Sequence, residues 1–235
     1  MRKSPSAAFT LIEMMTVIAV IVILTGMVLS ISGYATRKGA LARAEGEIQM
    51  ISSACESYKA DLGNYPRDVP AGGNGVTDML SPKQHFSPAS SSYTNASLFL
   101  YKQLSGDKTG KGGTDLPDGI PDDGEPRYFK ELDKRILNTK KDATTKAIIQ
   151  VNYIQDPFGF SYGYSTVAAK NEEDFQRKLK LATGNTKPER IKNDAKGGFN
   201  AGSFDLWSTG GDNTTVAPGS EESMALKWAK WVKNW

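Results

Sequence analysis

The stretch FTLIEMMTVIAVIVILTGM, residues 9–27, is apolar over almost its whole length and carries one carboxylate, Glu13, close to its beginning. No Asp, Glu, Lys or Arg occurs from Met14 to Thr36. Folded as an α-helix, this uncharged run would be about 34 Å long at ~1.5 Å per residue, enough for the ~30 Å hydrocarbon core of a bilayer. The sequence therefore predicts a helix that can span a membrane, with an acid where its apolar part begins.

The composition narrows the class of protein. The chain has 235 residues, of which 39% are hydrophobic and 23% charged, so it is long enough for one ordinary domain with an appendage. Its net charge of +3 is spread along the sequence, and no nucleic-acid partner is expected. The single cysteine, Cys55, and the single histidine, His85, disfavour a disulfide framework, a zinc hydrolase and a Cys–His or Ser–His–Asp nucleophile.

One interpretation of the amino terminus is a secretory signal peptide. Arg2 and Lys3 would form its basic region, and the small residues at 33–35 would offer a cleavage site. Two features count against it: the apolar run is longer than the ~7–15 residues typical of such signals, and Glu13 lies at its start.

The second interpretation places cleavage before the apolar run. Small residues precede Phe9, and cleavage after Ala8 would free an amine four residues from Glu13. A carboxylate in an apolar segment needs a partner of opposite charge, and an α-ammonium one helical turn away is within reach. In a filament, the carboxylate of one subunit would neutralise the amine of its neighbour and so set the register of the helices.

The leader MRKSPSAA followed by FTLIEMMTVIAVIVIL resembles the signature of type IV prepilins, although that family usually has glycine at the position of Ala8. The resemblance implies cleavage between Ala8 and Phe9 by a prepilin peptidase, N-methylation of Phe9, and a carboxyl domain in the periplasm, held by a single pass through the bacterial inner membrane. The expected organisation is a leader at 1–8, a transmembrane and filament-core helix at 9–33, its continuation at 34–62, and a periplasmic domain at 63–235 with a long insert at 67–146.

The helix is expected to continue beyond the apolar run. Apolar residues recur at steps of three and four, which predicts one buried face, and Gly63 with Pro66 shortly after it predicts the helix end. Cys55 lies on this face and is expected to be a core residue rather than a reactive thiol. The predicted stripe consists of Leu41, Ala44, Ile48, Ile51, Cys55, Tyr58 and Leu62.

The rest of the chain alternates loops with short elements. We expect a hairpin of strands 147–154 and 160–167 around the turn at 156–159, and the Trp-rich tail to place Trp228 and Trp231 on one helical face, packed on the core. The acidic stretch at 115–125 favours a solvated turn over a metal site. The remaining expected elements are a loop at 67–92, a helix at 94–104 capped by Thr94 or Asn95, a helix at 172–181 and a strand at 204–208.

Three motifs extend the resemblance. Tyr65-Pro66, then DPFG at 156–159, then FDLWSTGGDN at 204–213 look like the major pseudopilin of type II secretion systems. That resemblance implies an α+β ladle, with the long helix packed on a small antiparallel sheet, and a carboxyl-terminal loop that holds one Ca²⁺. Asp212, Glu221 and Glu222 stand at the positions of its acidic ligands. The alternative for these three acids is an ordinary solvated turn.

The expected function is that of a structural subunit of a pilus-like filament, without catalysis. The resemblance implies a homopolymer that also contains other pseudopilins, and as partners the prepilin peptidase, an inner-membrane assembly platform and membrane lipid. A pilin of a type IV pilus, for adhesion, motility or DNA uptake, remains the alternative. A membrane-anchored enzyme would need a set of convergent acids, for which 115–125 is the only candidate.

Overall fold

The structure, a computed structural model, describes eight segments of the chain. The leader, Phe9 and His85 lie outside the described residues, so the expected cleavage site is not part of the description. The side chains of residues 28–32, 179, 183 and 221–223 are also left out. The described segments are 10–70, 75–84, 87–110, 113–129, 133–183, 197–200, 202–213 and 221–235.

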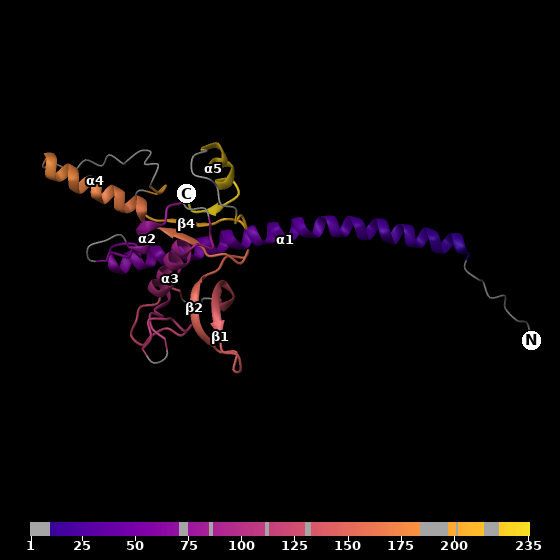
Figure 1. Ribbon diagram of the computed structural model, residues 1–235, viewed down its shortest axis with the longest axis horizontal. Helices are drawn as coiled ribbons and strands as arrows, with labels where there is room; N and C mark the ends of the chain where they lie inside the picture. The colour runs from indigo at the N-terminus through magenta and orange to yellow at the C-terminus, as the bar shows by residue number, and fades with distance from the viewer. Residues whose placement is uncertain are drawn as a thin grey trace, which may run out of the picture. The chain divides into compact units, whose positions relative to one another are not determined.

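The chain divides into two compact units, and each is considered by itself. Unit 1 runs from Met1 to Ala42, and its described part belongs to helix α1. Unit 2 runs from Arg43 to Trp235 and contains the rest of α1 with all the other elements (Figure 1).

Helix α1, Leu11–Leu62, confirms the expected long helix. Gly63 ends it as predicted: its φ of 80° is left-handed, and its N–H donates to the Lys59 carbonyl at 2.8 Å. The predicted stripe is buried in unit 2 at four of its positions, although Leu62 is 52% exposed because it lies in the last turn. The buried stripe positions are Ala44, Ile48, Ile51 and Cys55.

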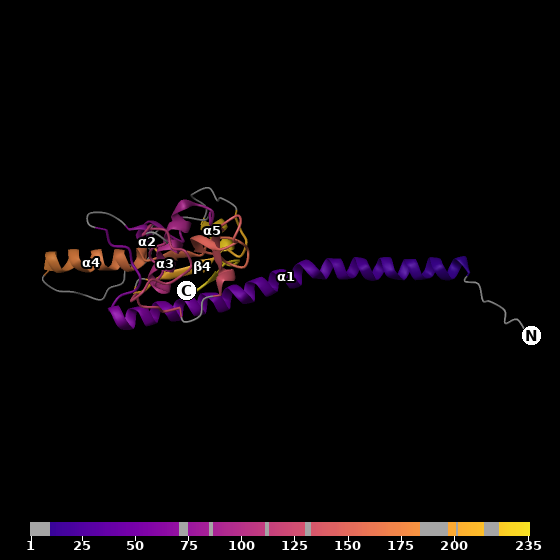
Figure 2. The same cartoon turned by 90° about the horizontal axis from the view of Figure 1, so that it is seen from below.

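Unit 2 has an α+β fold in which α1 packs on small antiparallel sheets, as expected (Figure 2). Tyr162 donates its hydroxyl to Glu47 of α1 at 2.7 Å, and Tyr164 donates to the Pro66 carbonyl at 2.7 Å. The elements that follow α1 are α2 (Val76–Met79), α3 (Ser91–Ser105), the 3₁₀ turn η1 (Lys134–Ile136), β1 (Leu137–Lys141), β2 (Ile148–Ile154), β3 (Gly163–Ser165), α4 (Val167–Thr183), β4 (Asp205–Ser208), α5 (Glu221–Trp228) and β5 (Val232–Lys233).

The expected hairpin is wrong in its extent. The turn forms, but pairing across it stops at an isolated bridge between Gln155 and Ser161, and the two strands belong to different sheets. One sheet joins β1 and β2, and the other has the order β3-β4-β5. On β2, the Val151 N–H donates to the Pro117 carbonyl at 2.7 Å, so at this residue β1 and the loop of Pro117 occupy the two sides of the strand.

Three other parts of the chain differ from the expected elements. Helix α3 begins at Ser91 with Ser90 at its cap position, three residues before the predicted start, and ends at the left-handed Gly106. The loop expected at 67–92 contains the short helix α2, and α4 begins at Val167, five residues before the predicted position.

The core of unit 2 is aromatic. Trp207 is fully buried, donates its indole N–H to the Tyr93 hydroxyl at 3.0 Å, and stacks on Trp231 with ring centroids 5.9 Å apart. The expectation that Trp231 packs in the core is confirmed. It does not share a helical face with Trp228, however, because α5 ends at Trp228 and a turn leads into β5.

Candidate assembly helix and carboxyl-terminal loop

Glu13 forms a capping box at the amino-terminal end of α1. Its Oε2 accepts hydrogen bonds from the Thr10 N–H at 2.8 Å and from the Thr10 hydroxyl at 2.7 Å. In return, the Glu13 N–H donates to Thr10 Oγ1 at 3.3 Å. This reciprocal pair satisfies N–H groups that lack partners at the start of a helix, and it places a negative charge near the positive end of the helix dipole. Thr three residues before Glu, directly ahead of an apolar run, is the sequence signal that the sequence analysis missed.

The capping box leaves part of the Glu13 carboxylate unused. Both hydrogen bonds from Thr10 go to Oε2, and Oε1 accepts none from the described residues. A cation can therefore approach Oε1 while the box stays intact. The expected partner, the amine of Phe9, lies outside the described residues, so that pairing stays a prediction.

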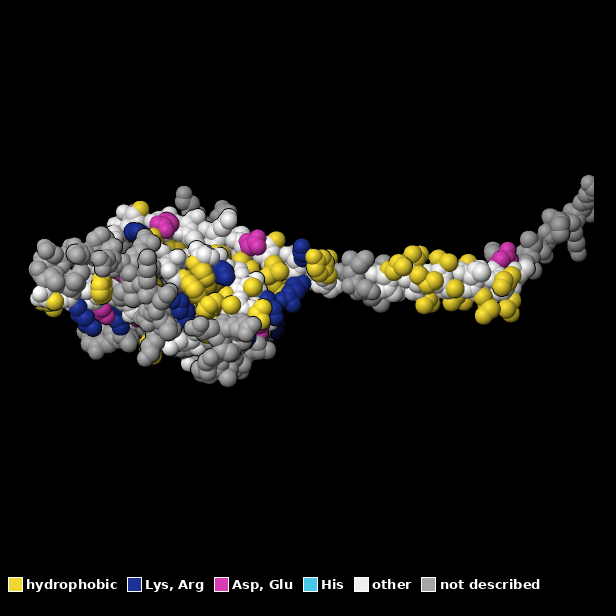
Figure 3. Space-filling model, turned by 90° about the horizontal axis from the view of Figure 1, so that it is seen from above, with side chains coloured by type: hydrophobic (Ala, Val, Ile, Leu, Met, Phe, Trp, Pro, Cys, Tyr) yellow, Lys and Arg dark blue, Asp and Glu magenta, His cyan; other side chains and the backbone are white. Residues whose placement is uncertain are grey.

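The first turns of α1 present an exposed apolar surface. The large hydrophobic side chains from Leu11 to Met27 are all more than half exposed, and they cover this part of the helix in Figure 3. The hydroxyls of Thr16 and Thr25 donate to carbonyls of their own helix at 2.9 and 2.7 Å, so they add little polarity to the surface. A contiguous apolar surface of this kind marks a site of contact with other molecules.

The expected membrane-spanning segment, 9–33, includes Phe9 and the side chains of residues 28–32, which lie outside the description. In the part of the chain that was described and searched, no helix has a stretch sufficiently long and apolar to cross a membrane.

The DPFG motif forms a turn built around Asp156. The Asp156 Oδ1 accepts the N–H groups of Phe158 and Phe160 at 3.0 and 2.9 Å, and its Oδ2 accepts the Ser208 hydroxyl. Burial raises the pKa of the Asp156 carboxyl, an effect that these hydrogen bonds oppose. The motif thus fastens the turn after β2 to the end of β4.

Asp205, in the FDLWS motif, has a similar role. Its two carboxylate oxygens accept the N–H groups of Phe199 and Asn200 at 2.8 and 2.9 Å. Burial raises the pKa of the Asp205 carboxyl as well. Asp156 and Asp205 therefore both anchor loops, and the geometry gives them no free oxygen pair for a ligand.

The loop after β4 carries the expected calcium residue Asp212. Gly210 and Gly211 turn the chain with φ of 62° and 84°, and the Asp212 N–H donates to the Thr209 carbonyl at 3.1 Å. The Asp212 carboxylate lies 3.8 Å from the Lys227 ammonium of α5, and both side chains are largely buried. A cation therefore already neighbours this acid, a feature that the sequence analysis did not foresee.

The other two expected ligands, Glu221 and Glu222, begin α5, but their side chains lie outside the description. Among the residues that the structure describes, no three His, Cys, Asp or Glu side chains are grouped so that they could hold a metal ion. The calcium set is thus untested, and it stays a prediction.

The acidic stretch at 115–125 is only partly the solvated turn that was expected. Asp118 is 7% exposed, and Asp122 accepts the N–H groups of Lys108 and Thr109 at 2.9 Å each. The buried Asp107, which no motif indicated, organises this region by accepting the Tyr101 hydroxyl at 2.7 Å and the Gly119 N–H at 2.7 Å. The acids of this region therefore accept hydrogen bonds from nearby backbone N–H groups and fix the conformation of its loops.

Comparison with known proteins bears on the amino terminus. Residues 3–29 match the family described as the prokaryotic N-terminal methylation motif. No curated protein and no solved structure matches the chain. The chain therefore carries a prepilin signal of the type IV pilin kind, followed by a helix whose start is capped by Thr10 and Glu13.

Proposed function

We propose that this protein is a structural subunit of a pilus-like filament, and specifically the major pseudopilin of a type II secretion system. The observation that carries the proposal is the methylation motif at 3–29, which coincides with the exposed apolar surface of α1. The three motifs that resemble pseudopilins, around Pro66, at 156–159 and at 204–213, support the more specific assignment.

Assembly proceeds through α1. The prepilin peptidase cleaves between Ala8 and Phe9, and Phe9 is methylated at its new amine. The apolar surface from Leu11 to Met27 then packs against the helices of neighbouring subunits, which removes it from water or lipid. The free Oε1 of Glu13 meets the amine of Phe9 on an adjacent subunit, while Oε2 keeps its bonds to Thr10.

The proposed partners follow from this route. Before assembly, the subunit is held in lipid of the bacterial inner membrane by a single pass, with unit 2 in the periplasm, and an inner-membrane platform extracts it into the filament. The subunit works by polymerisation with further copies and other pseudopilins, without catalysis and without nucleic acid. Asp212, Glu221 and Glu222 would hold a Ca²⁺ ion, which would supply positive charge to these acids, and Lys227 would then move away from Asp212.

The first test is the intact mass and amino-terminal sequence of the full chain extracted from native membranes. We expect a chain that begins at methylated Phe9. A chain that begins after Ala35 would show a secreted protein that has lost its helix, and the filament proposal would fall.

A second test separates secretion from pili. Deletion of the gene should abolish export of secreted proteins and leave surface pili intact. The opposite result, loss of pili with normal export, would assign the chain to a type IV pilus instead.

A further inference from the structure

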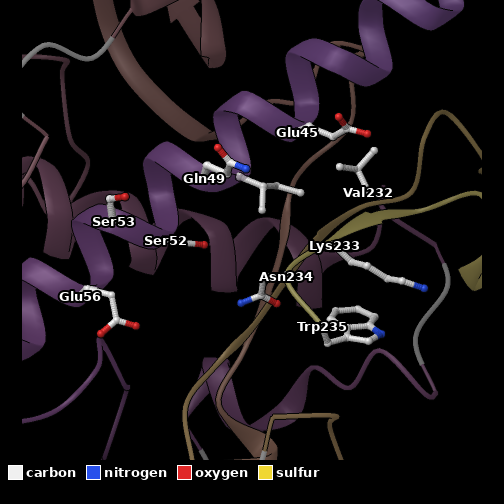
Figure 4. A pocket seen from close by; sticks show the side chains of 10 residues that line it. Glu45, Gln49, Ser52, Ser53, Glu56, Val232, Lys233, Asn234 and Trp235 are labelled. Carbon is white, nitrogen blue, oxygen red and sulfur yellow. The ribbon is translucent and has the colours of Figure 1, made fainter.

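Unit 2 contains a groove of about 710 Å³ between α1 and residues 232–235 (Figure 4). The wall formed by α1 is acidic, with Glu45 and Glu56 at its rim. The one lysine of the opposite wall, Lys233, points away from α1 in Figure 4, and its ammonium donates to the Trp228 carbonyl at 2.8 Å. Lys233 therefore does not neutralise the acids of the α1 wall.

The acceptors of this acidic groove are largely unused. Glu45 has no hydrogen bond or ion pair with the described residues. The Ser52 hydroxyl is buried without a partner in the described chain, and Glu56 accepts only the Tyr65 hydroxyl, at 2.9 Å. The Tyr65 hydroxyl in turn accepts from the Lys59 ammonium at 3.2 Å. The unpaired Glu45 carboxylate, the second oxygen of Glu56 and the Ser52 hydroxyl favour a ligand with cationic hydrogen-bond donors, such as lysine side chains.

The same unit presents such donors at the end of the β1–β2 hairpin, residues 140–147. Lys140 and Lys141 are exposed, and neither ammonium contacts a described partner. The loop is held rigid because the Asp142 carboxylate accepts the N–H groups of Thr144 and Thr145 at 2.9 and 2.7 Å. This basic hairpin tip is thus preorganised, which lowers the entropy lost when it binds.

The acidic groove and the basic hairpin tip lie on different faces of unit 2. In Figure 1 the β1–β2 hairpin and β5 are on opposite sides of α1. Two complementary patches on opposite faces of one chain give a head-to-tail contact, and such a contact leaves one free groove and one free tip at the two ends. Contacts of this kind propagate into open helical filaments when the rotation between subunits does not close a ring.

We propose that the acidic groove of one subunit receives the basic hairpin tip of a second copy, with Lys140 and Lys141 placed against Glu45 and Glu56. This inference rests on the proposed function, and it adds a contact between the folded domains to the packing of the helices. Because the pairs are at an exposed rim, they set orientation and register, and salt weakens them.

Disulfide cross-linking of the full chain tests this contact directly. We expect a chain carrying both Ser53→Cys in the groove wall and Thr144→Cys in the hairpin tip to give a ladder of oxidised multimers. The single variants should give none, since the native Cys55 is buried. The matched control pairs Ser53→Cys with Asp123→Cys, an exposed position on the acidic loop, and should also give no ladder.

The outcomes separate this inference from the proposed function. Filaments without the Ser53–Thr144 cross-link would overturn the docking of the hairpin tip and leave the pseudopilin proposal standing. If neither filaments nor cross-links form with the processed protein, both proposals fall. A cross-link from Ser53 to a different protein would also overturn the inference.

Charge reversal supplies an independent test. Lys140→Glu with Lys141→Glu should lower filament yield about tenfold or more, and so should Glu45→Lys with Glu56→Lys. The four changes together should restore the yield, because they exchange the two charges. Lys178→Glu on α4 makes the same type of change at an exposed lysine elsewhere and should have no effect. Failure of the fourfold variant to recover would contradict the pairing.

Discussion

Glu13 caps α1 in this structure, and a second role in subunit contacts is proposed for it. The cap is formed through Thr10, and the proposed second role is that Oε1 pairs with an amine of an adjacent subunit. The cap needs only a hydrogen-bond acceptor, whereas the contact with an amine needs the negative charge. These two roles can be separated by substitution, since glutamine keeps the acceptor and removes the charge.

Glu13→Gln and Glu13→Ala should both be cleaved at Ala8–Phe9, and both should lower filament yield by about tenfold or more, because an unpaired amine in an apolar contact is costly. Processing is measured by intact mass and assembly by electron microscopy of sheared fractions. Normal filaments from Glu13→Gln would show that only the cap matters, and the charge pairing would have to be abandoned.

Buried acids make the stability of unit 2 depend on pH. Burial raises the pKa of the Asp156 and Asp205 carboxyls in the folded chain. A raised pKa means that the folded state binds the proton more tightly than the unfolded state. The stabilisation is then complete below the unfolded pKa, about 3.8–4, and is lost as pH rises through the folded pKa.

We therefore expect the contribution of Asp156 to unfolding free energy to fall as pH rises from about 4 through its folded pKa. Asp156→Asn should flatten this dependence, because asparagine does not titrate, while its amide can still accept the N–H of Phe160. Urea unfolding of the full chain in detergent at a series of pH values measures both slopes. Equal slopes in the two proteins would contradict the assignment to Asp156.

At the scale of elements, the loop between β4 and α5 is the region that a bound Ca²⁺ ion would stabilise. Asp212 and Lys227 face each other at 3.8 Å, so the ammonium occupies the neighbourhood that a cation would need. Removal of the Lys227 ammonium should increase the affinity for Ca²⁺, and removal of the Asp212 carboxylate should abolish Ca²⁺ binding.

Saturating Ca²⁺ should raise the midpoint of thermal unfolding by roughly 5–10 °C, from the ~2.7 kcal/mol expected at a hundredfold excess over the dissociation constant. Asp212→Ala should eliminate this shift, and Lys227→Gln should show the full shift at a lower Ca²⁺ concentration than the unaltered chain. Differential scanning calorimetry with and without a chelator provides the measurement. An unchanged shift in Asp212→Ala would exclude this loop as the site.

Sequence patterns predicted the elements with strong local signals. The apolar periodicity and Gly63 gave the extent of α1, and the FDLWS stretch gave β4. Strand β1 was missed because its sequence, LNTKK, is polar and its place in a sheet comes from pairing with β2. The same dependence on distant partners explains the hairpin error, since Pro117 lies far from β2 in sequence.

Residues of the candidate site could be predicted only where their sequence neighbours indicate their role. Glu13 was singled out from its position, although its capping partner Thr10 was overlooked. Asp107 could not be found, because its importance lies in burial next to Tyr101 and Gly119 rather than in any motif. Lys227 approaches Asp212 only through the folding of α5 against the loop.

At the scale of the whole molecule, the chain separates a helical segment from a unit with its own core. Unit 2 buries aromatic side chains around Trp207 and so has a core of its own. A domain with its own core can in principle fold alone.

A chain that lacks residues 1–36 should therefore fold and remain monomeric without detergent, because it has lost the apolar helix that drives association. Sedimentation velocity reports the monomer, and near-ultraviolet circular dichroism reports the packing of Trp207 and Trp231. Loss of the near-ultraviolet signal would mean that unit 2 needs the rest of α1 to fold, and filament formation by this variant would contradict assembly through the helix.

Strand β2 is hydrogen-bonded on both sides at its centre, and this protects the chain from cross-β aggregation. Concentrated subunits with open strand edges can recruit one another into cross-β aggregates. Strand β1 covers one side of β2, and at Val151 the Pro117 carbonyl takes the other side. Pairing of β2 with a strand of another subunit is therefore blocked at Val151, and the proposed filament would grow only through contacts of helices and charged side chains.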